Sequence, residues 1–379
     1  MKKRVVIARS NSIDPDSRVE KEANSLARNG YDVTLLAWDR SKNYKKKIDK
    51  KKLSDSVVNR VSFGSKAEFG VGMKNIFPFI VFQWRLFVWL IRNADNYDIA
   101  HLCDYDTAII GSLASKIKKK KVVFDIFDYR SHDANSLGKK IFKRLEDHVI
   151  NSADATIICT EKRRKQIQGT HPQRLIVVHN TPETFRLEKQ SDLSVDNELI
   201  NVAYVGILQD YRLLKEEIAV ISKMPDIVLH IGGFGKYEEY VKAQARLYPN
   251  IVFHGKLPYA ETLQLESQCD IMLAVYDPSI PNHIYAAPNK FYEGLFLGKP
   301  LIMVNNTGMS EIVKKEKVGE IIQYSENGFR EGLTNLIARR KEWKSMSKRM
   351  RDIYDRQYNW AEMEKRLLSL YYDISRGNK

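Results

Sequence analysis

The sequence predicts an α/β protein built from two doubly wound parallel-sheet domains. Short apolar stretches, typical of buried strands, alternate with amphipathic stretches of helical period, as in parallel sheets covered on both faces. The alternation stops near Pro182, in a polar segment at residues 180–198, and then resumes. The chain has 379 residues and is 43% hydrophobic, which is enough apolar material for two globular domains.

The first half opens with a β-α-β unit. A strand at residues 5–8 is followed by a loop at 9–18. Because this loop lies at the carboxyl edge of a parallel sheet, where ligands bind, Asp16 and Arg18 are candidate site residues. Alternatively, Asp16 only caps the helix that follows. The other elements predicted here are strands at 32–38, 98–102, 121–126, 155–159 and 175–179, and helices at 19–29, 75–92, 107–116, 138–151 and 160–167.

Two of these strands end in carboxylates. Asp104 follows the strand at 98–102, and Asp125 and Asp128 lie at the end of the strand at 121–126. Carboxylates at the carboxyl edge of a sheet are better placed for chemistry than for packing. They could equally cap the helices that follow.

The second half repeats the pattern and closes with an amphipathic helix at 360–375. Gly206 and then Arg212 follow its first strand, and a glycine group at 232–235 follows the second. That group does not match a dinucleotide fingerprint, so it predicts a tight turn. The strands predicted here lie at 201–205, 227–231, 251–254, 271–275 and 301–304.

The stretch from residue 286 to 300 predicts an anion site. Pro288 suits the first turn of a short helix, and Gly298 suits its end. The free N–H groups of residues 289–292, together with the helix dipole and Lys290, would attract a phosphate. Glu293, one turn further on, could accept hydrogen bonds from a ribose diol. The alternative is an ordinary helix on which Lys290 and Glu293 form a solvated ion pair.

The positive charge is concentrated in the first half. Residues 1–185 hold 35 Lys and Arg against 21 Asp and Glu, whereas residues 186–379 hold 27 against 26. This asymmetry favours an anionic partner for the first half, either a membrane surface or nucleic acid. The very hydrophobic helix at 75–92 could rest on a bilayer or belong to the core. The lysine-rich run at 42–52 predicts an exposed loop.

The cysteines and the apolar segments indicate in which cellular compartment the protein is expected. Cys103, Cys159 and Cys269 have no paired spacing, which argues for a reducing compartment and against disulfides or zinc. The apolar run at the start is too short for a signal peptide, and residues 76–91 are too few and too polar for a spanning helix. The expected location is therefore cytoplasmic.

Residues 288–300, Pro-Asn-Lys-Phe-Tyr-Glu-Gly-Leu-Phe-Leu-Gly-Lys-Pro, resemble the donor-binding loop and helix of glycosyltransferase family 4. Residues 204–208 are similar to the glycine turn of that family, and residues 16–23, 97–102 and 145–159 resemble its first half. The resemblance implies a GT-B fold, in which two Rossmann-like domains face a central cleft. It places an acceptor domain at 1–182, a linker at 183–198 and a donor domain at 199–356, with the helix at 360–379 crossing back.

The resemblance also implies roles for individual residues. Glu293 would hold the donor ribose, and Arg212, Lys290 and the amides near Asn289 would meet the diphosphate. The donor-binding residues expected in all are Gly206, Arg212, Tyr285, Asn289, Lys290, Phe291 and Glu293. Lys290 and Arg212 would stabilise the charge of the departing phosphate without a metal ion or another cofactor. Independently of the resemblance, an acceptor hydroxyl must be oriented at the anomeric carbon, and Asp128 and Asp16 are the best candidates for this role, with Arg18 and Asp104 also on the acceptor side.

The sequence departs from the family at two positions. Tyr285 stands where many members have a second glutamate, and Phe127 stands near the position of a usual histidine. The expected activity is a retaining transfer from a UDP- or GDP-sugar to a glycan or lipid-linked acceptor, at an anionic membrane surface, in cell-surface polysaccharide assembly. One alternative is a sugar-nucleotide epimerase of the same fold. A nucleic-acid-binding protein is more remote, because no motif supports it.

Overall fold

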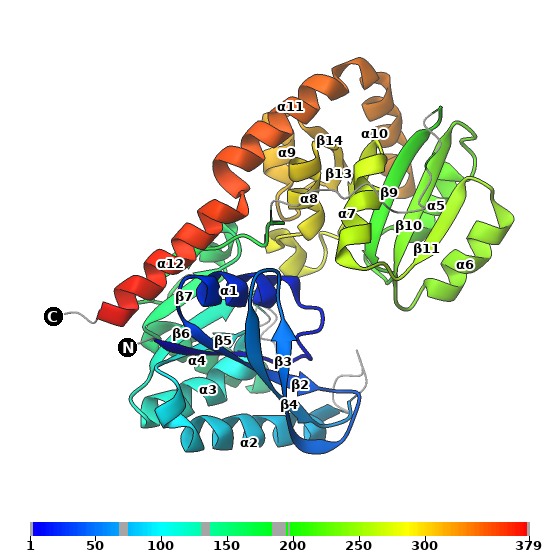
Figure 1. Cartoon of the computed structure of the whole chain (residues 1–379). Coiled ribbons are helices and arrows are strands. Elements are labelled where there is room, and N and C mark those ends of the chain that lie inside the picture. The colour runs from blue at the N-terminus through cyan, green and yellow to red at the C-terminus, as the bar shows by residue number, and fades with distance from the viewer. Residues whose placement is uncertain (1–2, 68–74, 130–136, 184–194, 196–197, 377–379) are drawn as a thin grey trace. The chain divides into compact units, whose positions relative to one another are not determined.

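The computed structural model describes residues 3–67, 75–129, 137–183, 195 and 198–376 (Figure 1). The chain forms two compact units. The N-terminal unit comprises Met1–His179 together with Met363–Lys379, and the C-terminal unit comprises Asn180–Glu362. The predicted acceptor domain, 1–182, thus extends slightly past the first unit. Most of the predicted linker, 183–198, lies outside the described residues.

The N-terminal unit is built on one sheet with the strand order β3-β4-β2-β1-β5-β6-β7-β8. All neighbouring strands are parallel except the β3–β4 pair. The central strands are mostly buried and mostly apolar, as expected for a parallel sheet covered on both faces. The strands are β1 (Arg4–Arg9), β2 (Asp32–Asp39), β3 (Tyr44–Lys52), β4 (Val57–Gly64), β5 (Ile99–Cys103), β6 (Lys121–Ile126), β7 (Ala155–Ile158) and β8 (Leu175–Val177).

Strands β3 and β4 correct the sequence-based prediction. The lysine run at 42–52 is not a loop: most of it forms β3, which pairs antiparallel with β4, a strand that was not predicted. The run lacks the alternation of apolar residues that marks a half-buried strand, because β3 is an exposed edge strand. Lysines on such an edge discourage pairing with other chains. The predicted helix at 160–167 is also shorter, a 3-10 turn at Glu161–Lys165.

Helices cover both faces of this sheet. Figure 1 shows α1 on one side and the layer of α2, α3 and α4 on the other, as right-handed crossovers require. None of the helices in the described part combines the length and the apolar character needed to cross a bilayer. The helices of the unit are α1 (Ser17–Arg28), η2 (Ala94–Asn96), α2 (Ile76–Arg92), α3 (Tyr105–Ile117), α4 (Leu137–Ser152) and α12 (Trp360–Arg376), which begins in the C-terminal unit.

Helix α12 is fixed to the N-terminal unit by specific contacts with residues far away in the sequence. The hydroxyl of Tyr371 lies 2.7 Å from His101 Nδ1 on β5, and its ring makes an edge contact with Tyr31. At the surface, Arg28 on α1 donates to the Glu364 carboxylate at 2.7 Å. The fully buried Tyr371 makes this helix part of the core of the unit.

The C-terminal unit is a second parallel sheet, with the strand order β11-β10-β9-β12-β13-β14. Its strands are β9 (Ile200–Ile207), β10 (Ile227–Phe234), β11 (Ile251–Gly255), β12 (Ile271–Ala274), β13 (Leu301–Val304) and β14 (Gly319–Ile322). Its helices are α5 (Leu214–Ile221), α6 (Glu238–Leu247), α7 (Tyr259–Gln268), η4 (Pro281–Tyr285), α8 (Asn289–Leu297), α9 (Ser310–Glu316), α10 (Glu326–Ala338), η5 (Arg340–Glu342), α11 (Trp343–Ile353) and the π-helix η6 (Tyr354–Tyr358). The prediction of two Rossmann-like parallel-sheet units is confirmed.

Candidate functional site

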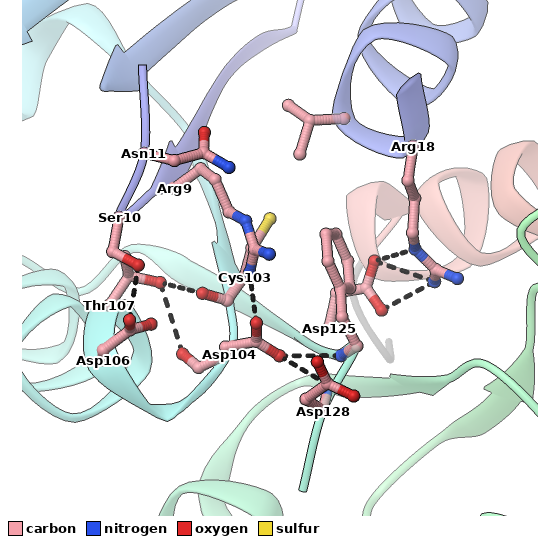
Figure 2. Close-up of polar contacts among 12 residues, drawn as sticks. Arg9, Ser10, Asn11, Arg18, Cys103, Asp104, Asp106, Thr107, Asp125 and Asp128 are labelled. Atoms are coloured by element: carbon pink, nitrogen blue, oxygen red, sulfur yellow. Dashed lines mark hydrogen bonds and ion pairs between the residues drawn. The ribbon is translucent and has the colours of Figure 1, made fainter. Parts of the chain in front are cut away.

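In the N-terminal unit, the ends of β1, β5 and β6 meet where the strand order reverses, between β1 and β5. Ligands bind at such switch points of parallel sheets. Asp104 lies there, directly after β5. Its Oδ1 accepts hydrogen bonds from the Phe127 and Asp128 amides at 2.8 and 3.0 Å, and its Oδ2 pairs with Arg9 (Figure 2). Asp104 thus ties the loop after β6 to the end of β1.

The backbone of Asp104 is held in a conformation that favours glycine, with φ 61° and ψ 166°. Its own N–H donates to the Asp125 carbonyl at 2.8 Å, and its carbonyl accepts from the Ala108 amide. Surrounding contacts must stabilise such a backbone, and strained residues of this kind cluster at functional sites. Asp104 is therefore better explained by a role at this edge than by capping alone.

Arg9 is a site residue that the sequence reasoning missed. Its guanidinium pairs with Asp16 and Asp104, and it lies 4.4 Å from the centre of the Phe127 ring. The Arg18 guanidinium lies 4.5 Å from the same ring. Phe127, predicted to stand near the position of a histidine, is therefore an aromatic partner of two cations. The only hint in the sequence was that Arg9 ends β1, the strand next to the one that Asp104 follows.

Asp104 titrates close to neutrality. Burial raises the pKa of its carboxyl to about 6, and the charges of Asp106 and Asp128 act in the same direction, whereas Arg9 opposes them. A carboxyl whose folded pKa exceeds its ordinary value stabilises the fold fully only at pH below that ordinary value. That contribution is lost as the pH rises through the folded pKa.

We therefore expect Asp104→Asn to change the pH dependence of stability. Between about pH 4 and pH 7, the unfolding free energy of the wild type should fall relative to the variant by about 3 kcal/mol, the equivalent of roughly two pKa units. Urea unfolding at a series of pH values measures the difference. A constant difference across this range would show that Asp104 does not titrate there.

Asp128 is the most accessible carboxylate of this edge, with 53% of its side chain exposed. Its Oδ1 accepts a hydrogen bond from Arg163 Nη2 at 3.3 Å. Arg163 is itself buried, and it donates to the Gln166 side chain and to the Cys159 sulfur. The amide and the side chain of Asp128 are both held by hydrogen bonds, so its exposed carboxylate has a defined direction.

Asp16 and Arg18 are not free for a ligand in the way the sequence suggested. Asp16 caps α1 by accepting from the Val19 amide, which is the simpler of the two predicted roles. The side chain of Arg18 is only 3% exposed and donates to Asp125 at 2.8 and 3.0 Å and to the Val178 carbonyl at 2.8 Å. Arg18 therefore belongs to the core of the unit and not to an acceptor surface.

Three buried side chains near Arg18 could in principle bind a metal ion. Glu22, His101 and Asp125 each place one ligand atom within 4.8 Å of the others, and no other such group occurs among the described residues. However, Arg18 already supplies a cation, 3.2 Å from Glu22 and 2.8 Å from Asp125. Burial raises the pKa of Glu22 well above its ordinary range, the charge of Asp125 adds to the rise, and the charge of Arg18 opposes it. These side chains therefore form a buried network of ion pairs with Arg18, and not a metal site.

In the C-terminal unit, the predicted anion site lies at the start of α8. Pro288 immediately precedes the helix, and Gly298 ends it in the left-handed conformation. Among the described residues, the Asn289 and Lys290 amides have no acceptor. The Phe291 amide donates to the Pro288 carbonyl at 3.0 Å, and its ring is completely buried. The ring of Phe291 therefore belongs to the core of the unit, and its donor-binding role stays a prediction.

Lys290 reaches across the backbone of β9. Its Nζ lies 4.6 Å from the centre of the Tyr204 ring, and a Cβ atom built on Gly206 would lie 2.6 Å from Nζ. A side chain at position 206 would therefore have to displace the ammonium group from this place. Gly206 and Lys290 are thus in close contact, although they are far apart in the sequence.

A second close approach explains part of the glycine group at 232–235. A Cβ atom on Gly233, whose φ is 142°, would lie 1.8 Å from the Gly206 carbonyl oxygen. The group does not form an isolated turn as predicted, because Gly233 still belongs to β10 and pairs with Gly206 on β9. The neighbouring strands β9 and β10 thus both have a glycine, with no side chain, at this paired position.

Buried carboxyls surround Lys290 and were not predicted. Burial raises the pKa of Glu217 and of Glu266 well above their ordinary range, and the charge of Lys290 opposes the rise in both. Glu293 is 4% exposed, and it accepts a hydrogen bond from the Tyr259 hydroxyl. It is not the solvated partner of Lys290 that the alternative reading supposed.

Arg212 forms no ion pair with a carboxylate among the described residues. Its guanidinium stacks 4.0 Å from the Tyr276 ring centre, and Nη1 lies 3.1 Å from His283 Nε2. His283 Nδ1 lies 2.8 Å from the Asp277 carbonyl, so Nδ1 carries the proton and Nε2 accepts from Arg212. Neutral groups thus orient the cation, which leaves its charge available for an anion.

The remaining predicted residues lie close to α8 in sequence. Tyr285 is half-buried at the end of η4, and Asn289 is exposed at the first position of α8. The side-chain oxygen of Asn289 accepts from the Asn180 amide group at 2.7 Å. Together, the C-terminal unit offers two cations and free amides, a donor set that suits a phosphate or diphosphate.

Models of two protein families match the chain. The model described as Glycosyltransferase Family 4 matches residues 17–184, and the model described as Glycosyl transferases group 1 matches residues 200–339. The first match contains every strand of the N-terminal sheet except β1, and the second contains every strand of the C-terminal sheet. No curated protein matches the chain by sequence.

Solved structures with the same fold cover essentially the whole chain. Sucrose-phosphate synthase from Thermosynechococcus elongatus has a TM-score of 0.78 at 13% identity and covers 100% of both chains. HepE of Anabaena, in complex with UDP-glucose, has a TM-score of 0.72 at 12% identity, covering 98% of this chain and 99% of its own. Trehalose 6-phosphate synthase from Burkholderia multivorans has a TM-score of 0.70 at 10% identity, covering 99% of each. At these identities the similarity concerns the fold.

Proposed function

Because this chain belongs to the GT-B glycosyltransferases, we propose that it transfers a sugar from a UDP- or GDP-sugar to a hydroxyl of a glycan or lipid-linked acceptor. The observation that carries the proposal is the arrangement of Arg212 and Lys290. Arg212 has no described carboxylate partner, and Lys290 lies beside free amides at a helix start. HepE, which has the same fold, is seen with UDP-glucose, and this supports a nucleotide-sugar donor.

The expected chemistry is charge stabilisation at the leaving group. As the bond between the anomeric carbon and the diphosphate oxygen breaks, negative charge builds on that oxygen. Arg212, Lys290 and the amides of Asn289 and Lys290 would oppose this charge, and such fixed donors provide a large share of catalysis. These groups can do so without a metal ion. The proposal also includes retention of the anomeric configuration, which the similarity to glycosyltransferase family 4 implies.

The ribose of the donor would be held by Glu293. Its carboxylate is nearly buried and is already oriented by the Tyr259 hydroxyl, so its position is fixed before a ligand arrives. A carboxylate accepts hydrogen bonds from both hydroxyls of a diol without reorganisation. Tyr285 and Asn289 are the further donor contacts in this proposal.

The acceptor would be bound by the N-terminal unit. Asp128 is the exposed carboxylate of its switch-point edge, and Asp104 holds the loop that carries it. In the proposal, Asp128 orients the attacking hydroxyl. The basic first half favours an acceptor at an anionic membrane surface, on the cytoplasmic side, in cell-surface polysaccharide assembly.

A thermal-shift screen of the purified protein against UDP- and GDP-sugars tests the donor. A ligand that binds only the folded state raises the apparent stability, by about 2.7 kcal/mol at a hundred times its Kd. We expect one nucleotide class to raise the Tm, also without an acceptor. If no nucleotide sugar or free diphosphate raises it, the donor assignment fails.

Glu293→Ala should weaken nucleotide-sugar binding strongly. Loss of a charged partner for two ribose hydroxyls is expected to raise the Kd by about tenfold to a hundredfold, or about 1.5–3 kcal/mol. Isothermal titration calorimetry measures the Kd, and the diphosphate alone, which has no ribose, should bind both proteins equally. An unchanged Kd for the nucleotide sugar would remove Glu293 from the ribose site.

Asp128→Asn should slow sugar transfer more than it weakens donor binding. Misplacement of a reacting group by about 1 Å can cost about 10²-fold in rate, so we expect kcat to fall by about that factor when the orienting carboxylate is lost. Initial rates at saturating donor measure it, and the matched control is Asp55→Asn, an exposed carboxylate in the same unit. If Asp128→Asn turns over like this control, Asp128 is only a structural residue.

A further inference from the structure

The layer of α2, α3 and α4 exposes large apolar side chains on the surface that faces away from the sheet. Phe77 is 73% exposed and Trp84 is 65% exposed. Single exposed apolar residues are ordinary, but a group spread over three adjacent helices marks an interaction site. The group, called here the outer apolar face, consists of Ile76, Phe77, Ile80, Trp84, Leu113, Ile117, Ile141, Phe142 and Leu145.

The spacing shows that this face is built into the helices. On α2, residues 76, 80 and 84 recur every four positions, whereas Phe82 and Leu86 on the opposite side of the helix are completely buried in the core. The same spacing of four recurs on α3 and on α4. Residues four apart lie on one side of a helix, so each helix contributes an apolar stripe. The layer therefore carries apolar side chains both on the side buried in the core and on the exposed side.

Exposed basic side chains border the outer apolar face, and acidic ones are few. Helix α2 carries no acidic residue. On α3 and α4, Glu146 is buried and Asp147 pairs with Lys143, while Asp106 accepts from Ser10. The exposed basic residues are Arg92, Lys116, Lys118, Lys119, Lys140 and Arg144.

We infer that the outer apolar face docks the enzyme on an anionic lipid bilayer. Aromatic and aliphatic side chains on the face would enter the interfacial region, and the lysines and arginines at its border would meet anionic headgroups. A second copy of the chain would bring like charges together at the border. Nucleic acid would use the basic residues but would leave the nine apolar ones uncovered.

The outer apolar face extends to the candidate acceptor edge of the same unit. Tyr105, directly after Asp104, makes an edge contact with Phe142, their ring centres 6.4 Å apart. A bilayer on this face would thus lie beside the loop that carries Asp128. The inference rests on the proposed function, because it assigns the acceptor to a lipid-linked class whose sugar-accepting end stays at the membrane surface.

Vesicle sedimentation of the full chain tests the docking. The probes are phosphatidylcholine vesicles with and without phosphatidylglycerol, at low salt. The test variant is Phe77→Ser/Trp84→Ser. The matched control is Leu247→Ser/Tyr372→Ser, which removes two exposed apolar side chains from elsewhere, α6 and α12. Melting curves check that both variants fold, and nucleotide-sugar thermal shifts check the donor site separately.

The wild type and the control should sediment with the anionic vesicles, and the test variant should bind at least about tenfold more weakly, because two large side chains no longer enter the lipid. Lys116→Glu/Lys119→Glu should weaken binding to anionic vesicles alone. Equal sedimentation of test and control variants would overturn the inference. Failure of the wild type to sediment with anionic vesicles would also overturn it, whether the protein dimerises through this face or stays monomeric. Vesicle binding without a nucleotide-sugar shift would uphold the docking and reject the proposed donor.

Discussion

Lys290→Met should lower kcat by about 10²–10³-fold, the loss seen when one fixed donor to a developing negative charge is removed. Methionine keeps most of the length of the lysine side chain but not its charge. The cost is expected to be large because the ammonium group is nearly buried, over Tyr204 and against Gly206, where charge interactions are weakly screened. Initial-rate kinetics with saturating donor measures it.

Lys215→Met is the matched control for this prediction. Lys215 lies on α5 of the same unit and is exposed. Its ammonium group lies over the rings of Tyr237 and Tyr240. It should keep the wild-type kcat. Turnover of Lys290→Met at the level of this control would show that Lys290 serves only to offset the buried carboxyls Glu217 and Glu266.

Arg18→Met should be the most destabilising of these substitutions. It removes the cation from a closed network and leaves Asp125 as an uncompensated buried carboxylate, which typically costs about 3–5 kcal/mol. Burial by itself raises the pKa of Asp125, and the charge of Arg18 with the His101 hydrogen bond lowers it below its ordinary range. Urea unfolding near neutral pH, where Asp125 is ionised, measures the loss.

Arg28→Met provides the contrast on the same helix. Arg28 is about half exposed and pairs with Asp55 and Glu364 at the surface, so its loss should cost at most about 1 kcal/mol. Comparable losses for the two variants would mean that the buried network contributes no more than a surface pair.

The fold was predictable because parallel sheets leave a strong pattern in the sequence. The strand at Leu301–Val304 and the glycine stop at Gly298 were predicted as observed, since a completely buried strand and a left-handed helix end depend on local residue choice. Strand β3 was missed because an exposed lysine-rich edge owes its conformation to pairing with β4 and not to its own composition.

The candidate site was predictable only in part. Lys290 and Glu293 were predicted from a helix start, whereas Arg212 was predicted from the resemblance to a family turn, and the structure places all three in the C-terminal unit. Contacts between distant segments were not predictable. No spacing rule indicates that Arg9 pairs with Asp104. The sequence also could not show that Arg18 lies in the core, because Asp125 lies more than a hundred residues away from it.

The return of α12 to the N-terminal unit has a consequence for synthesis on the ribosome. The first unit is discontinuous, since residues 180–362 are inserted between its two pieces. The inserted unit is a single stretch of chain and can complete its own sheet while translation proceeds. The N-terminal unit cannot complete its core until Tyr371 has been synthesised, because His101 and Tyr31 both contact that residue. The domain that starts first is thus the one that finishes last.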